Sequence, residues 1–281
     1  AYSYPILRPL QDEIRRRGDD VAWFIEPDCP VLLNQDERWL QSVQEVMDYQ
    51  PIAVFAPGNY IYDFFPGVKV SLFHGYPINK RGDEKDVYCT QGETSTLPFK
   101  ELERKYGFFK VYETGWCKAD TFVKERVHTP HNARPVVLYS STFTKNITSA
   151  PHLFDTIKRL VREKNWDWII SFHPKFSDME VLKKYKELAA SCPNITFHES
   201  GLVDAKLLNS ADVLLSDASS VIVEAMMLDK PVVTYCNTMP GAHLLNVTET
   251  DAVEGAIEKA ISRPAELMER CLLYTSPSPR D

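Results

Sequence analysis

A strand end followed at once by a helix start brings hydroxyl and carboxylate side chains together in the second half of the chain. The apolar run Val213–Leu215 predicts a strand, Ser216 and Asp217 follow it, and Ser219 and Ser220 open an apolar helix. A helix start offers unpaired N–H groups and the positive end of the helix dipole, and hydroxyls add further donors. This combination suits a phosphate, so all four polar residues are candidates for binding a phosphorylated ligand.

Glu224 adds a carboxylate to the same predicted helix. It follows Ser220 by one helical turn, so the two side chains share a face. Within the apolar sequence VIVEAMML a carboxylate is costly unless it has a partner, and a ribose diol would be a fitting one. The alternative is that Ser219 only caps the helix and Glu224 pairs with an arginine. The segment from Val213 to Tyr235 thus predicts a site for a phosphorylated ligand, such as a nucleotide-activated donor, with ordinary capping as the alternative.

Two histidines directly follow apolar strands, one in each half of the chain. His173 follows WDWIISF and should project from the same rim as Ser219 and Ser220, where its imidazole could donate to a phosphate oxygen. His74 follows KVSLF and precedes Gly75, which permits the close approach of a ligand. An ordinary pKa of about 6.5 makes His74 a suitable general base at neutral pH. A histidine at a strand end can also be purely structural, and it is the pairing of the two that favours a site.

Other polar residues give weaker signals. Thr142, with Ser140 and Ser141, ends a predicted strand and could reach a phosphate, although such hydroxyl clusters are common in loops. The sequence contains no P-loop, no dinucleotide fingerprint, no metal-ligand spacing and no nucleophile elbow. We therefore expect no metal and no cofactor apart from a donor substrate.

Composition excludes several classes of protein. The net charge of −7 argues against a nucleic-acid partner, because no basic stripe is available to displace phosphate counterions. The six cysteines are scattered and form no CxxC pair, which fits reduced thiols in a cytoplasmic protein. No run approaches the roughly 20 apolar residues that cross a bilayer.

Helical and strand patterns alternate along the chain, which predicts a parallel α/β architecture. We expect a first Rossmann-like domain over residues 1–127, a linker over 128–135 and a second such domain over 136–270, facing each other across a cleft. Ligands of such sheets bind at the carboxyl ends of the strands. In the first domain we expect helices at 5–17, 37–49 and 99–106 and strands at 21–25, 52–56, 69–73 and 109–112. In the second we expect strands at 136–139, 168–172, 195–197, 213–215 and 232–235 and helices at 151–164, 178–190, 204–209, 219–228 and 252–262.

The last residues, CLLYTSPSPRD at 271–281, resemble the translation of a sequencing adapter joined to an unfinished gene. We exclude them from the fold prediction as a processing scar. The alternative is a natural disordered tail rich in serine and proline.

Four phrases in order along the chain resemble the CDP-glycerol glycerophosphotransferase family, whose members build teichoic acids and related polymers on a GT-B-like pair of Rossmann domains. They are SLFHGYPINKRG, VVLYSSTFTKN, WIISFHPKF and LLSDASSVIVEAMMLDKPVVTY. The resemblance runs from about Phe73 to Tyr235 and is stronger in the second domain.

The resemblance implies roles for the matched positions. His74 takes the place of the proposed catalytic base. His173, Ser219 and Ser220 take the places that bind the donor's pyrophosphate. Asp217 shapes the loop that carries the two serines. By a looser analogy with GT-B enzymes, Glu224 holds the ribose.

The chain also departs from the family. An arginine expected after the aromatic residue is replaced by Thr144, so that phosphate neutralisation must come from elsewhere, for which Lys145 is a candidate. The segment between Arg81 and Tyr88 is short, and the family's first N-terminal strand and loop are not found.

The resemblance implies transfer of glycerol phosphate from CDP-glycerol to a hydroxyl of a lipid-linked or surface glycan, with release of CMP. It also implies peripheral contact with the inner face of the cell membrane. One alternative is another GT-B enzyme, either a glycosyltransferase or a UDP-N-acetylglucosamine 2-epimerase, although these often carry Ser-Asp-Ser-Gly-Gly where this chain has Ala218-Ser219-Ser220. Another is a nucleotide-sugar binding protein without catalysis, which would need no base at His74.

Overall fold

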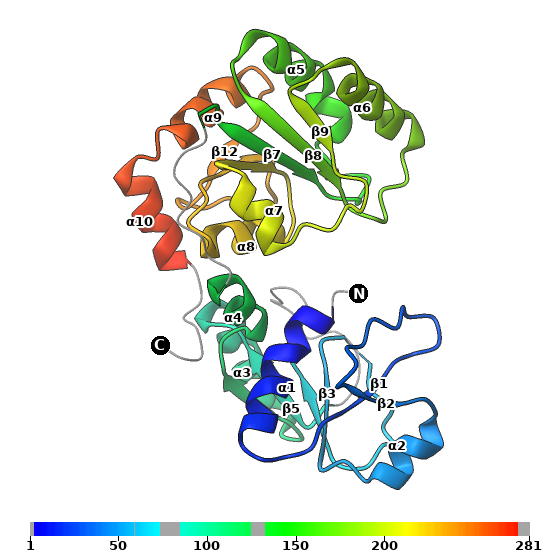
Figure 1. Cartoon of the computed structure of the whole chain (residues 1–281). Helices are drawn as coiled ribbons and strands as arrows, with labels where there is room; N and C mark the ends of the chain where they lie inside the picture. The colour runs from blue at the N-terminus through cyan, green and yellow to red at the C-terminus, as the bar shows by residue number, and fades with distance from the viewer. Residues whose placement is uncertain (1–2, 59, 74–84, 125–132, 275–281) are drawn as a thin grey trace. The chain divides into compact units, whose positions relative to one another are not determined.

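The computed structural model describes residues 3–58, 60–73, 85–124 and 133–274 (Figure 1). The protein is α/β, and its sheets are parallel throughout the described residues, as the alternating pattern predicts. The chain divides into two compact units: unit 1 holds the described residues up to Thr121, and unit 2 holds those from Phe122 onward.

Unit 1 is built on a four-stranded sheet of order β3-β4-β5-β6 and a separate parallel pair, β1-β2. Side chains alternate across the larger sheet. Val70 packs with Ile6 of the first helix on one face, whereas Tyr88 packs with Phe99 on the other. The elements are α1 (Tyr4–Arg16), β1 (Ala22–Phe24), β2 (Arg38–Leu40), α2 (Val43–Tyr49), β3 (Ala53–Ala56), β4 (Val68–Ser71), β5 (Val87–Thr90), α3 (Glu93–Tyr106), β6 (Lys110–Glu113) and α4 (Cys117–Lys124), within which the division between the units falls.

The helix predicted at 37–49 is wrong in its first half. The structure places strand β2 at Arg38–Leu40, paired with β1, and begins α2 only at Val43. Glu37 is buried, where its carboxylate accepts from Arg8 Nε at 2.9 Å and Gln11 Nε2 at 3.1 Å, both on α1. The hydrogen bond from Arg8 holds the pKa of Glu37 at about 2. These bonds hold Glu37 against α1, so the residues that follow it extend as β2. Helix α2 therefore begins only after its N-cap residue, Ser42.

That cap is visible in the sequence. Ser42 Oγ accepts from the backbone N–H of Glu45 at 3.2 Å, and Glu45 Oε2 accepts in return from the N–H of Gln41 at 2.9 Å. This exchange resembles a capping box, whose Ser-x-x-Glu spacing marks a helix start.

Three elements of unit 1 differ from the prediction in other ways. Strand β5 and helix α4 were not predicted, and α3 begins at Glu93 instead of residue 99. The first turn of α3 is held by side-chain bonds to its own backbone, with Ser95 Oγ and Thr96 Oγ1 each donating to the carbonyl of Gly92 at 2.9 Å. The helix therefore begins six residues before the predicted start and contains Pro98 within its first two turns.

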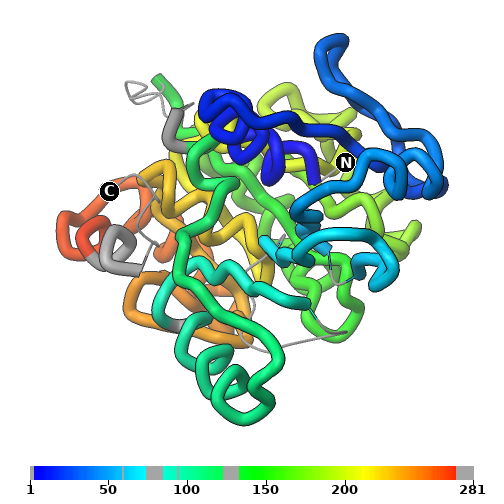
Figure 2. Tube along the Cα trace, turned by 90° about the horizontal axis from the view of Figure 1, so that it is seen from below, coloured from blue at the N-terminus to red at the C-terminus, as the bar shows by residue number. Residues whose placement is uncertain are grey.

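Unit 2 is built on one six-stranded parallel sheet of order β12-β11-β10-β7-β8-β9. Figure 2 shows the Cα trace of the chain, coloured from the N-terminus to the C-terminus. The elements are β7 (Val136–Ser141), α5 (Ala150–Glu163), β8 (Asp167–Phe172), α6 (Met179–Ser191), β9 (Ile195–Phe197), α7 (Ala205–Ser210), β10 (Val213–Ser216), α8 (Val221–Met227), β11 (Val232–Tyr235), β12 (Leu245–Val247), α9 (Ala252–Ile261) and α10 (Ala265–Tyr274).

Helices cover both faces of this sheet, with α5, α6 and α9 on one side and α7, α8 and α10 on the other (Figure 1). Strand β7 shows why: Val137 and Tyr139 face the first layer, Leu138 faces the second, and all three are fully buried. A strand buried on both faces is apolar without alternation, as the sequence of β7, β8 and β10 indicates.

The C-terminal part of unit 2 contains two elements beyond the prediction, β12 and α10. Helix α10 extends to Tyr274 and so crosses residue 271, where we placed the start of a processing scar. That assignment remains a prediction.

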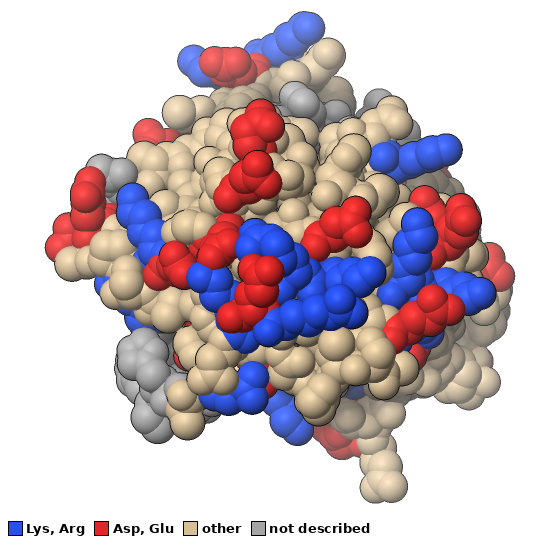
Figure 3. All heavy atoms as spheres, turned by 90° about the horizontal axis from the view of Figure 1, so that it is seen from above, with Lys and Arg blue, Asp and Glu red and all other residues tan. Residues whose placement is uncertain are grey.

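Charges on the surface are mixed. On the face in Figure 3, lysine and arginine side chains lie among aspartate and glutamate. Ion pairs of this kind join α5 to α9, where Arg159 and Lys164 both bind Glu254. No helix in the described part of the chain is long and apolar enough to cross a bilayer. The cysteines among the described residues with described side chains are free thiols.

Candidate functional site

The strand order of unit 2 reverses between β7 and β10. The chain runs outward from β7 through β8 to β9, returns to β10 on the other side of β7, and continues to β11 and β12. In open α/β sheets, ligands bind outside the carboxyl ends of the strands at such a reversal. Ser141 and Thr142 end β7 here, and Ser216 and Asp217 end β10, so the structure brings these predicted residues to one edge.

Asp217 holds this edge together. Its Oδ1 accepts from the backbone N–H groups of Thr142 at 2.9 Å and Ala218 at 2.7 Å. Its Oδ2 accepts from Ser141 Oγ at 2.7 Å and from both the N–H and the Oγ of Ser149 at 2.8 Å. The side chain is fully buried, and five donors compensate for the burial of its charge. Asp217 thus ties β10 to the end of β7 and to the start of α5.

Ser216, like Asp217, forms its side-chain hydrogen bond inside the protein. It is fully buried, and its hydroxyl donates to the carbonyl of Ser140 at 2.7 Å, which joins β10 to β7. The carbonyl of Asp217 accepts from Asn237 Nδ2 at 2.5 Å, so that the loop after β11 is held against the same edge. The geometry gives Ser216 and Asp217 the role of positioning their neighbours.

Ser219 and Ser220 follow Asp217 in the chain and are more accessible to a ligand than Ser216 and Asp217 are. Ser219 is half-buried and Ser220 is exposed, both just before α8. Ser220 takes the N-cap position without a side-chain capping bond, and Ser219 Oγ accepts from the N–H of Val221 at a long 3.4 Å. Their hydroxyls are therefore only weakly engaged by the helix itself. Phosphate binding by these two residues remains a prediction.

Two further predicted residues, Thr142 and Glu224, are buried. Thr142 contributes its N–H to Asp217 and lies at the end of β7, beside the reversal. Glu224 is buried on α8 and has an interaction partner within the protein. Contact of Thr142 with phosphate and of Glu224 with a ribose also remain predictions.

His173 follows β8, the strand next to β7, as the sequence predicts. Its Nδ1 accepts from the backbone N–H of Lys175 at 3.0 Å, which requires the neutral tautomer that carries its proton on Nε2. Partial burial lowers the pKa of His173 below 6.5, and the nearby Lys175 ammonium lowers it further. At neutral pH the ring is therefore uncharged, with Nε2–H free to donate to a ligand.

Phe143 packs against this imidazole. The two ring centroids lie 4.4 Å apart at an interplanar angle of 37°. The ammonium of Lys175 lies 5.8 Å from the centroid of the same phenyl ring, at cation–π distance. A cation, an imidazole donor and an aromatic ring therefore meet at the carboxyl edge of unit 2.

His74 lies outside the described residues, so its role as a base stays a prediction. The residue before it is described and unusual. Phe73 has φ of 51°, a left-handed conformation that costs a bulky residue free energy. Its ring stacks on Tyr88 with centroids 5.9 Å apart, and its carbonyl accepts from Trp116 Nε1 at 3.3 Å. These contacts hold the strained turn in place at the end of β4.

The sequence interpretation missed four contributors: Ser149, Asn237, Phe143 and Lys175. Ser149 precedes the predicted helix at 151–164, so a helix-cap signal was present, but its bond to Asp217 spans 68 residues. Asn237 likewise acts across the fold, through the loop after β11. Phe143 and Lys175 flank predicted residues, and only the fold shows that they meet.

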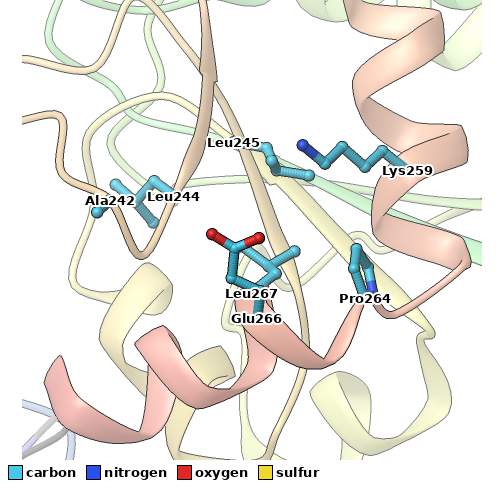
Figure 4. Close-up of a pocket in the computed structure, with 7 residues that line it drawn as sticks. All are labelled: Ala242, Leu244, Leu245, Lys259, Pro264, Glu266 and Leu267. Carbon is cyan, nitrogen blue, oxygen red and sulfur yellow. The ribbon is translucent and has the colours of Figure 1, made fainter.

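A small pocket lies elsewhere in unit 2, between the start of β12 and helices α9 and α10 (Figure 4). Its walls are mostly aliphatic, and it contains none of the predicted site residues. It is lined by Ala242, Leu244, Leu245, Lys259, Pro264, Glu266 and Leu267. The described residues include no group of three or more histidine, cysteine, aspartate or glutamate side chains placed to hold a metal ion.

Solved structures with a similar fold include two kinds of protein. A putative UDP-N-acetylglucosamine 2-epimerase from Listeria monocytogenes has a TM-score of 0.68 at 11% identity, over 98% of this chain and 89% of that one. The S. aureus MnaA–UDP structure gives 0.66 at 13% identity, over 97% and 88%. A variant of the wall teichoic acid polymerase TagF gives 0.63 at 12% identity, over 95% and 79%. At these identities the likeness shows the fold alone, which is of the GT-B type, as predicted.

No curated protein matches the chain in sequence. A family model does match, over residues 72–239, which is more than half of the chain and spans all the predicted site residues. It is described as CDP-glycerol:poly(glycerophosphate) glycerophosphotransferase. The resemblance drawn from the four sequence phrases is thereby confirmed, and the chain belongs to this glycerophosphotransferase family.

Proposed function

We propose that the protein transfers glycerol phosphate from CDP-glycerol to a hydroxyl of a lipid-linked or surface glycan and releases CMP. The observation that carries this proposal is the family match over residues 72–239, which spans His74 and the loops around Asp217. A structure of the TagF polymerase soaked with CDPG shares the fold at a TM-score of 0.64, which is consistent with this donor. Peripheral contact with the inner face of the cell membrane, where a lipid-linked acceptor would lie, is part of the proposal.

In the proposed reaction the acceptor oxygen attacks the β-phosphorus of CDP-glycerol. The new P–O bond forms as the bond to the CMP oxygen breaks, and His74 takes the acceptor proton. CMP leaves with the electron pair of the broken bond. His173 donates through Nε2–H to the phosphate oxygens on which charge accumulates, and Ser219 and Ser220 donate to the same group.

The remaining site residues bind and position the donor. Thr142 adds a hydroxyl at the end of β7, and Glu224 is assigned to the ribose. Ser216 and Asp217 hold the loops in which these groups stand, through the buried bonds to Ser140 and Ser149.

The test is CMP release from CDP-glycerol in the presence of membranes that carry a glycan acceptor. We expect acceptor-dependent release, and a loss of roughly 100-fold or more in His74→Ala, the usual scale for a general base. The matched control is His198→Ala: this histidine also follows a strand, β9, but at the outer edge of the sheet, and it should leave the rate unchanged.

Two results would reject the proposal in different ways. Full activity of His74→Ala would remove the assigned base. Turnover of UDP-N-acetylglucosamine instead of CDP-glycerol would place the protein with the epimerase-like enzymes of the same fold.

A further inference from the structure

Three aromatic rings of unit 1 form an exposed row after β3. Tyr62 stands in the middle, with its ring centroid 5.1 Å from that of Tyr60 and 5.1 Å from that of Phe64. The two outer residues are strongly exposed, Tyr60 at 59% and Phe64 at 52%. Aromatic side chains gathered on a surface in this way mark a binding site more often than single exposed residues do.

The row is anchored to the hydrophobic core beneath it. Phe65 is buried and packs edge-on against both Tyr62 and Phe24, with centroids 5.2 and 5.6 Å apart. The hydroxyl of Tyr62 donates to Glu26 Oε2 at 3.2 Å, which ties the row to the loop after β1. The middle ring of the row is therefore held by a fixed support, and ordering it on binding costs little entropy.

The row also lies at the edge of a parallel sheet where ligands usually bind. Its residues follow the carboxyl end of β3, and Glu26 follows the carboxyl end of β1. Both loops therefore extend from the strand ends at which α/β proteins bind their substrates.

The charges around the row are acidic. Glu26, Asp28 and Asp63 are exposed on the two loops. Between Arg17 and Lys69 the sequence contains one basic residue, Arg38, which pairs with Asp20. Two arginines of α1 also reach the loop after β1, and each is paired there, Arg8 with Glu37 and Arg15 with Asp36. An anionic lipid surface or a phosphate would be repelled here, whereas a neutral polyol would find carboxylate acceptors for its hydroxyls.

We infer that Tyr60, Tyr62 and Phe64 form a stacking surface for a pyranose ring of the acceptor, with Glu26 and Asp63 accepting hydrogen bonds from its hydroxyls. A pyranose has an apolar C–H face that stacks on an aromatic ring and a rim of hydroxyls that donate to carboxylates. An uncharged sugar is thus the ligand that satisfies both the row of rings and the acidic border. The inference rests on the proposed function in one respect, that the acceptor is a glycan.

The test uses N,N′-diacetylchitobiose, a soluble neutral disaccharide, and measures saturation transfer from the protein to the sugar by NMR without CDP-glycerol. We expect transfer to the sugar C–H protons, and a loss of affinity of roughly tenfold or more in the double variant Tyr60→Ala/Phe64→Ala. The control is Tyr106→Ala, which removes an equally exposed aromatic of unit 1, at 50%, that lies beside Phe108. It should bind as the unaltered protein does. Glycerol 3-phosphate should not compete, because it has no ring to stack.

The outcomes separate this inference from the proposed function. Absence of disaccharide binding, or binding that the double variant retains, would overturn the stacking surface even if CDP-glycerol is turned over. Vesicle binding that depends on Tyr60 and Phe64 would overturn it in favour of a membrane contact. Ring-dependent sugar binding without turnover of CDP-glycerol would support the surface and reject the donor assignment.

Discussion

His173 shows how neighbouring groups set the chemistry of a single side chain. The N–H of Lys175 occupies Nδ1, so the proton of the neutral ring sits on Nε2 and can be donated. Burial is the main cause of the lowered pKa, and the charge of Lys175 adds to it. Phe143 lies against the imidazole in a tilted arrangement and is the ring placed to exclude water from it. The same two neighbours that orient the imidazole therefore also keep it uncharged at neutral pH.

We predict that Phe143→Ala raises the pKa of His173, because it exposes the ring to water, and that Lys175→Gln raises it by a smaller amount. The measurement is an NMR titration of the imidazole between pH 4.5 and 8.5. In the unaltered protein the midpoint should lie below 6.5. The neutral form, in which Nδ1 accepts from the N–H of Lys175, therefore predominates above that pH and is lost as pH falls through the lowered pKa, whereas the Nε2–H is present in both forms.

Lys186→Gln is the control for the removal of a lysine, since Lys186 pairs with Glu199 on a different loop. It should leave the midpoint of His173 unchanged. If Phe143→Ala also leaves it unchanged, the ring does not desolvate the imidazole and its assigned role is wrong.

At the scale of secondary-structure elements, a buried carboxylate joins two strand ends to a helix start. Asp217 receives five hydrogen bonds from β7, the start of α5 and its own loop. The loop that presents Ser219 and Ser220 is consequently set by long-range contacts, and only secondarily by its local sequence.

We predict that Asp217→Ala destabilises the protein by about 3 kcal/mol or more, because it leaves several buried donors without an acceptor. Asp204→Ala is the matched control: its carboxylate caps α7 through one bond to the N–H of Leu207, and its loss should cost about 1 kcal/mol. The measurement is the urea midpoint by circular dichroism. Equal losses in the two variants would show that Asp217 is an ordinary cap.

At the scale of the whole molecule, the two units divide the proposed work. The predicted donor residues that the structure describes all lie in unit 2, at the carboxyl edge of its six-stranded sheet. The aromatic row proposed for the acceptor sugar and the predicted base His74 lie in the part of the chain assigned to unit 1.

We predict that CDP slows amide hydrogen exchange in unit 2, in peptides that cover residues 141–150, 172–177 and 216–224. The reason is that a bound diphosphate occupies the edge where these loops meet and stabilises them against opening. The measurement is hydrogen–deuterium exchange followed by mass spectrometry, with peptides of α1 and β1 as the internal control. Protection concentrated in unit 1 would contradict the assignment of the donor to unit 2.

The sequence by itself determined the features that arise within a few residues of one another. Doubly buried strands are continuous apolar runs, so β8, β10 and β11 were placed to within a residue or so, and with them the strand-end position of His173. The α/β class and the family followed from the same local patterns and phrases. Even the start of α2 was encoded locally, in the spacing of Ser42 and Glu45.

Only the tertiary structure decided which side chains meet. Arg8 binds Glu37 across 29 residues. The predicted start of a helix at Glu37 is therefore a buried ion pair, followed by strand β2. Ser149 binds Asp217 across 68 residues, and this partner could not be read from the loop that Asp217 was predicted to shape. A buried polar group takes the partner that the fold brings to it, because leaving it unpaired costs more than any local preference can offset. The sequence therefore predicted that the segment from Ser216 to Glu224 forms a site. Only the fold showed that Ser216 and Asp217 are buried and bonded within the protein, whereas Ser220 is exposed.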